Sequence, residues 1–217
     1  MVIIVLPFVI AVTMLISIVA EYRRARTVVY VFKPLSTVLI ITLAALAQPA
    51  ECTYQVLIII GLVFSLAGDV FLMLPEEPRS FFVPGLVVFL IAHLFYIVAF
   101  CLGGGWSSKD LLVALPFLAF GIGTAAYLWP SLGAMRAPVA LYILVILAMG
   151  WRSGVRIYAV DAPMPGAVIA LVGAVLFIFS DLILALNRFV RPFASARATN
   201  LTTYFAGQTC IALSVHM

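Results

Sequence analysis

Two aspartates lie inside apolar stretches of this sequence, where an ionisable side chain is unexpected. Asp69 lies near the end of the segment SLAGDVFLMLP, residues 65–75, and Asp181 lies near the end of FIFSDLILAL, residues 177–186. A charged side chain at the centre of a bilayer costs at least about 2.5–3.5 kcal/mol, so such a residue is a candidate for function. If both side chains reach one dry pocket, burial and mutual repulsion keep one of them protonated, and the pair supplies an acid and a base.

The composition indicates the environment of these aspartates. The chain has 217 residues, of which 66% are hydrophobic and 9% are charged, whereas a soluble domain carries about 25% charged residues. Apolar runs of about 20 residues recur along the whole chain, which is the length that spans a bilayer as a helix. We therefore expect an all-α, multi-pass integral membrane protein with a single domain, residues 1–217, in the inner membrane if the source is bacterial.

Charge and ligand residues argue against several other classes of protein. The net charge of +4 is what basic cytoplasmic loops give a membrane protein, so it does not indicate nucleic-acid binding. The cysteines, Cys52, Cys101 and Cys210, show no metal-ligand spacing, and their odd number argues against a disulfide framework. Two histidines are too few for a three-histidine zinc site. We expect no metal and no cofactor.

The apolar runs predict a bundle of about eight transmembrane helices. Lys and Arg favour cytoplasmic loops, and with the N-terminus outside only Lys109, Arg152 and Arg156 fall in outer loops. Both termini are therefore predicted to lie outside. The predicted segments are 2–20, 33–48, 54–74, 81–101, 110–129, 137–153, 165–186 and 199–216. The inner loops then hold Arg23, Arg24, Arg26, Lys33, Arg79, Arg136, Arg188, Arg191 and Arg197.

This orientation gives the two aspartates a depth in the membrane. Asp69 lies five residues before Leu74, the inner end of its segment, and Asp181 lies five residues before Leu186. At 1.5 Å per residue, both carboxylates lie about 7–8 Å inside the cytoplasmic boundary, which allows one shared pocket. The alternative, that each aspartate reaches water or pairs with a Lys or Arg, stays open, although aspartate is short and snorkels poorly.

Other polar side chains fall in the same half of the predicted bundle. Within each segment they recur three or four residues apart, on one face of the helix. Structural roles remain open, because a lone histidine more often packs than reacts, a boundary lysine is often an anchor, and polar residues commonly bond between helices. The candidates are Lys33 with Ser36 and Thr37, Ser65, His93 with Tyr96, Asn187 with Arg188, and Tyr204 with Gln208.

Several blocks of the sequence resemble one family of membrane proteins. They run in order through nearly the whole chain, and each block alone is a weak signal. On these blocks the chain resembles the YhhN family, whose characterised members are lysoplasmalogenases. The blocks are Lys33-Pro34-Leu35, residues 65–74 with Gly68-Asp69, Gly85-Leu86 with Phe89, Ala92-His93-Leu94 with Tyr96, Phe179-Ser180-Asp181, Asn187-Arg188-Phe189, and Thr203-Tyr204 with Gln208.

The resemblance implies hydrolysis of the vinyl ether bond of lysoplasmalogens, which gives a fatty aldehyde and glycerophosphoethanolamine or glycerophosphocholine. A vinyl ether is cleaved by protonation of its β-carbon, attack of water on the oxocarbenium ion, and collapse of the hemiacetal. Asp69 and Asp181 are expected to be the catalytic acid and base, with the order of roles open. The residues expected to orient water or the ether oxygen are Ser65, His93, Tyr96, Tyr204 and Gln208.

The same hypothesis assigns positions to the headgroup and the hydrocarbon chain of the substrate. Lys33, Asn187 and Arg188 are expected to hold the phosphate at the inner boundary, and the hydrocarbon chain is expected in the apolar outer half of the bundle. The expected partners are this lysophospholipid and bilayer lipid, without nucleic acid and without an obligate protein partner.

Two other functions use the same pair of aspartates. A lipid-binding or proton-coupled transport protein would use them without hydrolysis, although the sequence shows no convincing repeat of whole halves. An intramembrane aspartyl protease would carry Gly-x-Gly-Asp, but Leu66 occupies the position of the first glycine, and the Pro-Ala-Leu element of that class is absent.

Overall fold

The computed structural model describes residues 2–48, 51–74, 81–103, 108–159 and 162–217, and these residues form eight α-helices and no β-strand. Seven of the eight helices are long and apolar enough to cross a membrane. The predicted all-α bundle is therefore confirmed. The helices are α1 Val2–Tyr22, α2 Arg26–Ala45, α3 Cys52–Met73, α4 Phe82–Cys101, α5 Ser108–Leu128, α6 Arg136–Val155, α7 Met164–Ala185 and α8 Ala196–Leu213.

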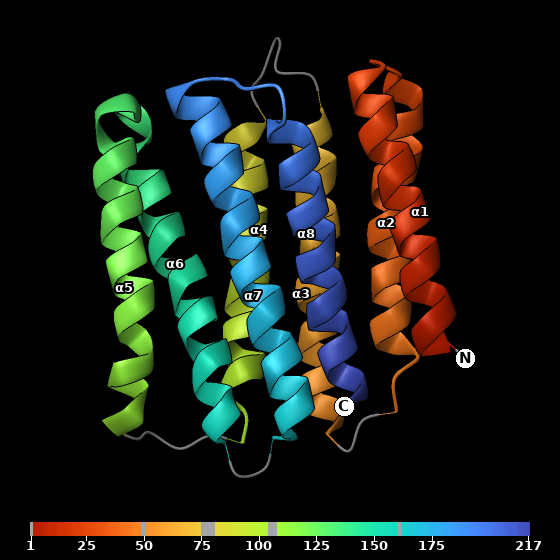
Figure 1. The fold of residues 1–217 in the computed structure, drawn as a ribbon, viewed down its shortest axis with the longest axis vertical. Helices are drawn as coiled ribbons and strands as arrows, with labels where there is room; N and C mark the ends of the chain where they lie inside the picture. The colour runs from red at the N-terminus through yellow and green to blue at the C-terminus, as the bar shows by residue number, and fades with distance from the viewer. Residues whose placement is uncertain (1, 49–50, 75–80, 104–107, 160–161) are drawn as a thin grey trace.

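The helices lie side by side in one bundle (Figure 1). The pair α1 and α2 forms one side, the pair α5 and α6 forms the other, and α3, α4, α7 and α8 lie between them. Both chain ends lie at the same end of the bundle, as an even number of crossings requires. That this end faces outward remains a prediction.

The helix that is not apolar enough to count as a candidate membrane span is α8. It packs against α7, α2, α1 and α3, so it lies largely within the bundle. Its polar residues Tyr204 and Gln208 are buried, at 4% and 0% exposure. A helix surrounded by other helices satisfies polar side chains with protein partners, so its low hydropathy marks an interior position.

Glycines bring neighbouring helices into close contact beside the aspartates. A Cβ atom on Gly207 of α8 would lie 2.8 Å from the Gly173 carbonyl oxygen of α7. A Cβ atom on Gly68, next to Asp69, would lie 2.6 Å from the Phe89 ring of α4. Neither position has room for a side chain, so these glycines set the separation of the helix pairs that carry the polar residues.

The second helix begins earlier than predicted. The apolar run predicted a segment that starts at residue 33, but α2 begins at Arg26, and Pro34 lies inside it. The turn before it is short, with Arg24 at φ 55°. Lys33 therefore lies about 10 Å along the helix axis from its start and is 8% exposed. It is a buried residue inside α2 rather than the first residue of the helix.

Polar contacts of buried residues close the opposite end of the bundle. Arg152, predicted in an outer loop, lies in α6, 3.4 Å from the Asp110 carboxylate. Arg156, predicted in the same loop, donates to the Leu102 carbonyl oxygen at 2.7 Å and lies over the Tyr54 ring. Both arginines are 6% exposed. The predicted segment 137–153 was too short, because α6 runs to Val155 and a short 3-10 helix, Arg156–Tyr158, follows it directly.

Candidate active site

A cavity of about 830 Å³ enters the bundle at the end where α1 joins α2. Asp69 of α3 and Asp181 of α7 both line it. The equal depths expected from the sequence thus correspond to one shared cavity. The wall also contains residues from α1, α2, α4, α6 and α8, so most of the bundle contributes to it.

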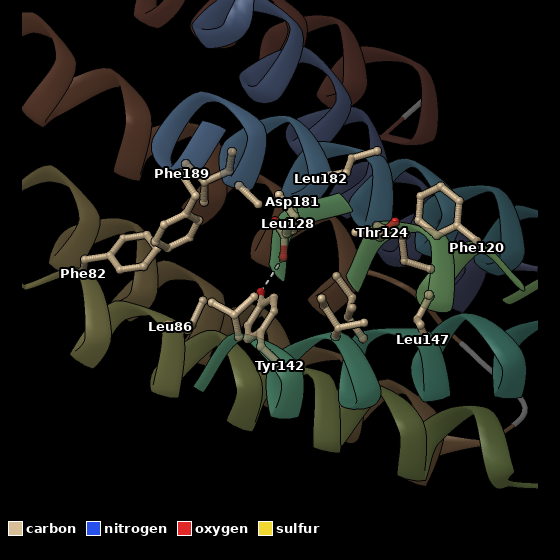
Figure 2. Close-up of a pocket in the computed structure, with 17 residues that line it drawn as sticks. Phe82, Leu86, Phe120, Thr124, Leu128, Tyr142, Leu147, Asp181, Leu182 and Phe189 are labelled. Atoms are coloured by element: carbon tan, nitrogen blue, oxygen red, sulfur yellow. Dashed lines mark hydrogen bonds between the residues drawn. The ribbon is translucent and has the colours of Figure 1, made fainter. Parts of the chain in front are cut away.

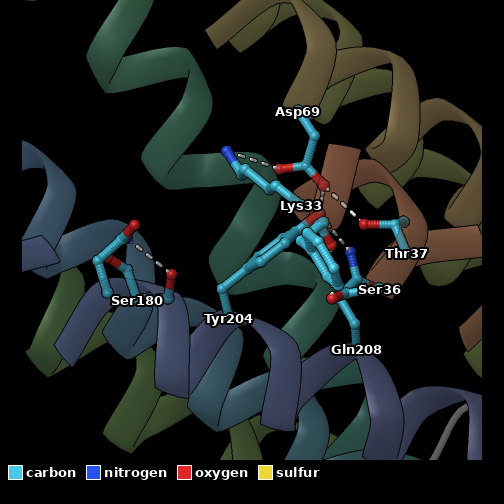
Figure 3. A network of polar contacts seen from close by, with 9 residues as sticks. Lys33, Ser36, Thr37, Asp69, Ser180, Tyr204 and Gln208 are labelled. Carbon is cyan, nitrogen blue, oxygen red and sulfur yellow. Dashed lines mark hydrogen bonds and ion pairs between the residues drawn. The ribbon is translucent and has the colours of Figure 1, made fainter. Parts of the chain in front are cut away.

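Asp69 is held by three donors from two other helices (Figure 3). The Thr37 hydroxyl donates to Oδ2 at 2.9 Å, and the Tyr204 hydroxyl donates to the same oxygen at 2.7 Å. The Lys33 ammonium lies 3.2 Å from Oδ1. Asp69 is 1% exposed. An ammonium and two hydroxyl donors are a partner set that suits a carboxylate anion.

A hydrogen-bonded chain continues from Tyr204 into the bundle. The Tyr96 hydroxyl donates to Gln208 Oε1 at 2.8 Å and lies 3.4 Å from the Ser65 hydroxyl, and Gln208 Nε2 lies 3.5 Å from the Tyr204 hydroxyl. Ser65, Tyr96 and Gln208 are all 0% exposed. Of the residues predicted to orient water, Tyr204 therefore reaches the cavity wall, and these three lie behind it.

Asp181 has a different surrounding from Asp69. Its Oδ2 accepts a hydrogen bond from the Tyr142 hydroxyl of α6. Its other neighbours along the cavity wall include the apolar side chains of Leu184, Leu86 and Phe82. Tyr142 was missed by the sequence reasoning. The signal was present, because Tyr142 lies six residues beyond Arg136, at a predicted depth of about 9 Å that matches the aspartates.

His93 lies among aromatic rings rather than on the cavity. Its ring centroid is 4.7 Å from that of Phe177 and 5.4 Å from that of Tyr142, both edge to face. It is 0% exposed, and in the described part of the chain neither ring nitrogen has a hydrogen-bond partner of normal geometry, apart from a weak contact to the backbone of Phe89. The structure thus places His93 behind the Tyr142 ring.

The residues expected at the phosphate separate into two groups. Lys33 is engaged with Asp69, so its position favours a structural ion pair over a free phosphate ligand. Arg188 lies over the Phe82 ring, and Asn187 accepts a hydrogen bond from the Phe193 backbone N–H at 3.2 Å; both side chains line the cavity. Three further arginines do so as well, namely Arg24, Arg26 and Arg197.

A polar pair on α7 and α8 completes the wall and was also missed. Asn200 Nδ2 donates to the Ser180 carbonyl oxygen at 2.8 Å and to its hydroxyl at 3.0 Å. The bond joins α8 to α7 one residue before Asp181. Spacing along one helix does not reveal such a contact, because it depends on how two helices face each other.

A second, apolar cleft meets the cavity at Asp181 (Figure 2). Asp181 and Tyr142 line both spaces, together with Phe82, Leu86 and Leu184. The cleft lies between α4, α5, α6 and α7. Asp181 thus stands where a polar space and an apolar space join.

Metal ligands do not gather at this site. Among the described residues, no group of three or more His, Cys, Asp or Glu side chains lies close enough together to hold a metal ion. The donors around Asp69 are hydroxyl groups and an ammonium group, which compete with a cation for the carboxylate oxygens.

These features define a multi-pass α-helical membrane protein with two carboxylates on one interior cavity. The model of the YhhN family matches residues 28–215, and the chain belongs to this family. The resemblance seen in the sequence is thereby confirmed. No solved structure is significantly similar to the chain.

Three relatives illustrate the family. The chain is 38% identical over 160 residues to lysoplasmalogenase TMEM86A of Bos taurus, covering 72% of this chain and 64% of the relative. It is 35% identical over 157 residues to lysoplasmalogenase TMEM86B of Homo sapiens, covering 71% and 61%. It is 29% identical over 204 residues to the uncharacterized membrane protein YhhN of Escherichia coli O157:H7, covering 93% and 94%. The chain thus spans less than two thirds of the two named lysoplasmalogenases.

Proposed function

We propose that this protein is a lysoplasmalogenase, which hydrolyses the vinyl ether bond of a lysoplasmalogen to a fatty aldehyde and a glycerophospho-base. The observation that carries the proposal is that Asp69 and Asp181 line one cavity. Relatives at 35–38% identity are named for this activity. The chemistry needs one proton donor and one proton acceptor, and no redox step.

Asp69 fits the role of base. Its oxygens face an ammonium group and two hydroxyl groups, all of which stabilise a negative charge. The same contacts fix the orientation of the carboxylate, so that a water molecule in the cavity has one defined acceptor. Asp69 thus orients and deprotonates the attacking water.

Asp181 fits the role of acid. Its hydrogen bond comes from one neutral hydroxyl, and much of its surroundings is apolar, which favours the neutral carboxylic acid. Asp181 donates its proton to the β-carbon of the vinyl ether, and its new negative charge then faces the oxocarbenium ion. Water adds to that ion as Asp69 takes its proton, which gives the hemiacetal.

Collapse of the hemiacetal restores both groups. Asp69 returns its proton to the departing glycerol oxygen, and Asp181 takes the hydroxyl proton of the hemiacetal as the aldehyde forms. The sum of the steps is one water molecule consumed per bond cleaved, with both aspartates in their starting states. A single pair of oppositely protonated carboxyl groups is therefore sufficient.

The arginines at the cavity mouth suit the phosphate of the headgroup. Arg24, Arg26 and Arg188 line the cavity, and so does Arg197, which pairs with the Glu21 carboxylate at 3.3 Å. Guanidinium groups bind phosphate oxygens in a bidentate manner. We place the headgroup there, with bilayer lipid around the bundle. Nucleic acid and an obligate protein partner have no part in this proposal.

The test is product release in heavy water by the purified protein. With a vinyl ether lysolipid in D₂O, the aldehyde is expected to carry one deuterium on the carbon next to its carbonyl group, provided it is reduced at once to the alcohol. An alkyl ether lysolipid is expected to give no product. Cleavage of both ethers at similar rates, or an aldehyde without deuterium, contradicts protonation of the vinyl carbon.

The aspartates are tested against a matched control. Asp69→Asn and Asp181→Asn are each expected to lower turnover by at least about a hundredfold, as expected for loss of a catalytic acid or base. Asp110→Asn removes a buried carboxylate that pairs with Arg152 at the opposite end of the bundle, and it is expected to keep turnover near that of the unmodified protein. Normal turnover in either folded cavity variant refutes the proposed pair.

A further inference from the structure

The apolar cleft beside Asp181 has a composition unlike that of the cavity. Polar side chains in its wall are confined to Thr124, Tyr142 and Asp181, and the remaining residues are aliphatic, aromatic or glycine. Figure 2 shows Asp181 and Tyr142 on one side of Thr124, with Phe120 and Leu147 on the other. The cleft therefore leads away from the carboxylate along a path that is apolar except for Thr124.

The cleft extends from the site to the lipid-facing surface. Phe120 lines it and is 39% exposed on α5. Neighbouring side chains of α5 are also apolar and exposed, such as Ile122 at 71%. Towards the other end, Leu128 and Val139 belong to a buried apolar cluster, so the cleft does not open widely there. A hydrocarbon chain in the bilayer can thus enter sideways without crossing a polar surface.

We propose that this cleft, with a volume of about 60 Å³, holds the first carbons of the hydrocarbon chain of the lysolipid against Asp181, with the headgroup in the arginine-lined cavity. The proposal rests on the function proposed above and adds the position of the substrate. The occupant is one chain of a lysolipid, because the apolar cleft adjoins the polar cavity at Asp181 and Tyr142, which line both spaces, so one molecule with a polar head and an apolar chain fits the two together. Asp181 then lies beside the alkenyl carbons and Asp69 on the headgroup side.

This position differs from the one expected from the sequence. The chain was expected in the outer half of the bundle, whereas the cleft lies in the half that holds the carboxylates. From Phe120 to Leu128 its wall follows α5 for about 12 Å. Because the cleft is narrow, with a volume of about 60 Å³, it receives only a few carbons of the chain, and the rest of the chain extends past Phe120 into the bilayer.

Photolabelling tests the position without relying on turnover. The probe is an alkyl ether lysophosphocholine with a diazirine in the middle of its chain, added to the full-length protein in nanodiscs. Labelling is expected on the cleft residues Phe120, Gly121 and Leu147, and an excess of unlabelled lysolipid is expected to abolish it. Labelling spread over outward residues such as Ile122, or competition that is equal with a diacyl phospholipid, overturns the proposal.

Two phenylalanine variants on α5 provide a matched comparison. Thr124→Phe fills the cleft, while Ile122→Phe adds the same ring on the lipid-facing side. Because each buried methylene group contributes about fourfold to affinity, Thr124→Phe is expected to reduce labelling about tenfold or more, and Ile122→Phe to leave it unchanged. Equal effects of the two variants contradict the proposal, and the labelling map of the unmodified protein decides the matter if Thr124→Phe does not fold.

The outcomes separate this proposal from the proposed function. If labelling is confined to the cleft but the protein does not cleave vinyl ethers, the lysolipid-binding site is supported and the proposed hydrolase function is refuted. If the protein cleaves vinyl ethers but the label lies elsewhere, the hydrolase function is supported and the proposed position of the chain is refuted.

Discussion

The ion pair between Lys33 and Asp69 gives a prediction that separates a structural lysine from a phosphate ligand. Lys33→Met keeps the length of the side chain and removes its charge. The Asp69 carboxylate, 1% exposed, then retains two hydroxyl donors and loses the one positive partner found for it at 3.2 Å in the described residues. If the ammonium instead serves a phosphate, the change affects substrate affinity and leaves the folded state nearly unchanged.

The size of the effect follows from distance and burial. Two unit charges 3.2 Å apart attract by about 5 kcal/mol at an effective dielectric constant near 20, and removing one partner of a buried pair costs about 3–5 kcal/mol. Lys33 touches the cavity, where water weakens the attraction, so we expect about 3 kcal/mol for Lys33→Met. In an Asp69→Asn background the same change is expected to cost less than about 1 kcal/mol, since the amide carries no charge, which leaves a coupling energy of about 2 kcal/mol.

The measurement is unfolding of the four proteins of this double-mutant cycle in mixed micelles with increasing sodium dodecyl sulfate, followed by circular dichroism. Arg197→Met serves as the control, because its pair with Glu21 has a similar distance of 3.3 Å but side chains that are 63% and 27% exposed. An exposed pair contributes about 0–1 kcal/mol. Additive effects of Lys33→Met and Asp69→Asn, within about 0.5 kcal/mol, refute the structural ion pair.

Three further variants test other parts of the structure. Tyr142→Phe removes the hydrogen bond to Asp181 and is expected to lower kcat about tenfold with little change in KM; an unchanged kcat in steady-state assays counts against the bond. Gly207→Ala places a methyl group 2.8 Å from a carbonyl oxygen of α7 and is expected to lower the free energy of unfolding by about 1–3 kcal/mol in the same unfolding assay. Its control is Gly123→Ala, where no atom lies within 4 Å of the added methyl group, and this change is expected to be neutral or stabilising. His93→Phe replaces a buried ring that lacks hydrogen bonds of normal geometry in the described residues, so the free energy of unfolding is expected to stay equal or rise by about 1 kcal/mol; a clear loss would indicate a bound partner.

The fold was predictable from the sequence because it depends on composition and length. Apolar runs of helical length predicted eight helices, and all eight are present. The ends were less predictable where a residue has two possible roles. Lys33 was predicted as the first residue of a helix but lies inside α2. Arg152 and Arg156 are loop residues by charge but buried partners of Asp110 and Leu102 in the structure. Charge alone does not distinguish a solvated arginine from a paired one.

The candidate site was predictable to the extent that it depends on depth. Periodicity and rise per residue placed Asp69 and Asp181 at one level, and both line one cavity. The partners were not predictable, because rotation of a helix about its axis decides them. Tyr142 was at a suitable depth but was one of several aromatic residues. Lys33 was predicted at the start of a helix, whereas α2 begins at Arg26, so Lys33 lies inside this helix.

The two aspartates occur in similar sequences, and the proposed difference between their roles rests on what the other helices provide. A proton transfer to the vinyl carbon creates a cation on the substrate and an anion on the donor, and an enzyme gains most from contacts that strengthen as these charges appear. At Asp181 the Tyr142 hydroxyl is such a contact, because its hydrogen bond is stronger to a carboxylate than to a carboxylic acid. At Asp69 the ammonium of Lys33 favours the carboxylate before the reaction begins, so protonation there weakens an existing contact. A proton donor is therefore better placed at Asp181, and this is why Tyr142→Phe should reduce kcat while Lys33→Met should mainly reduce stability.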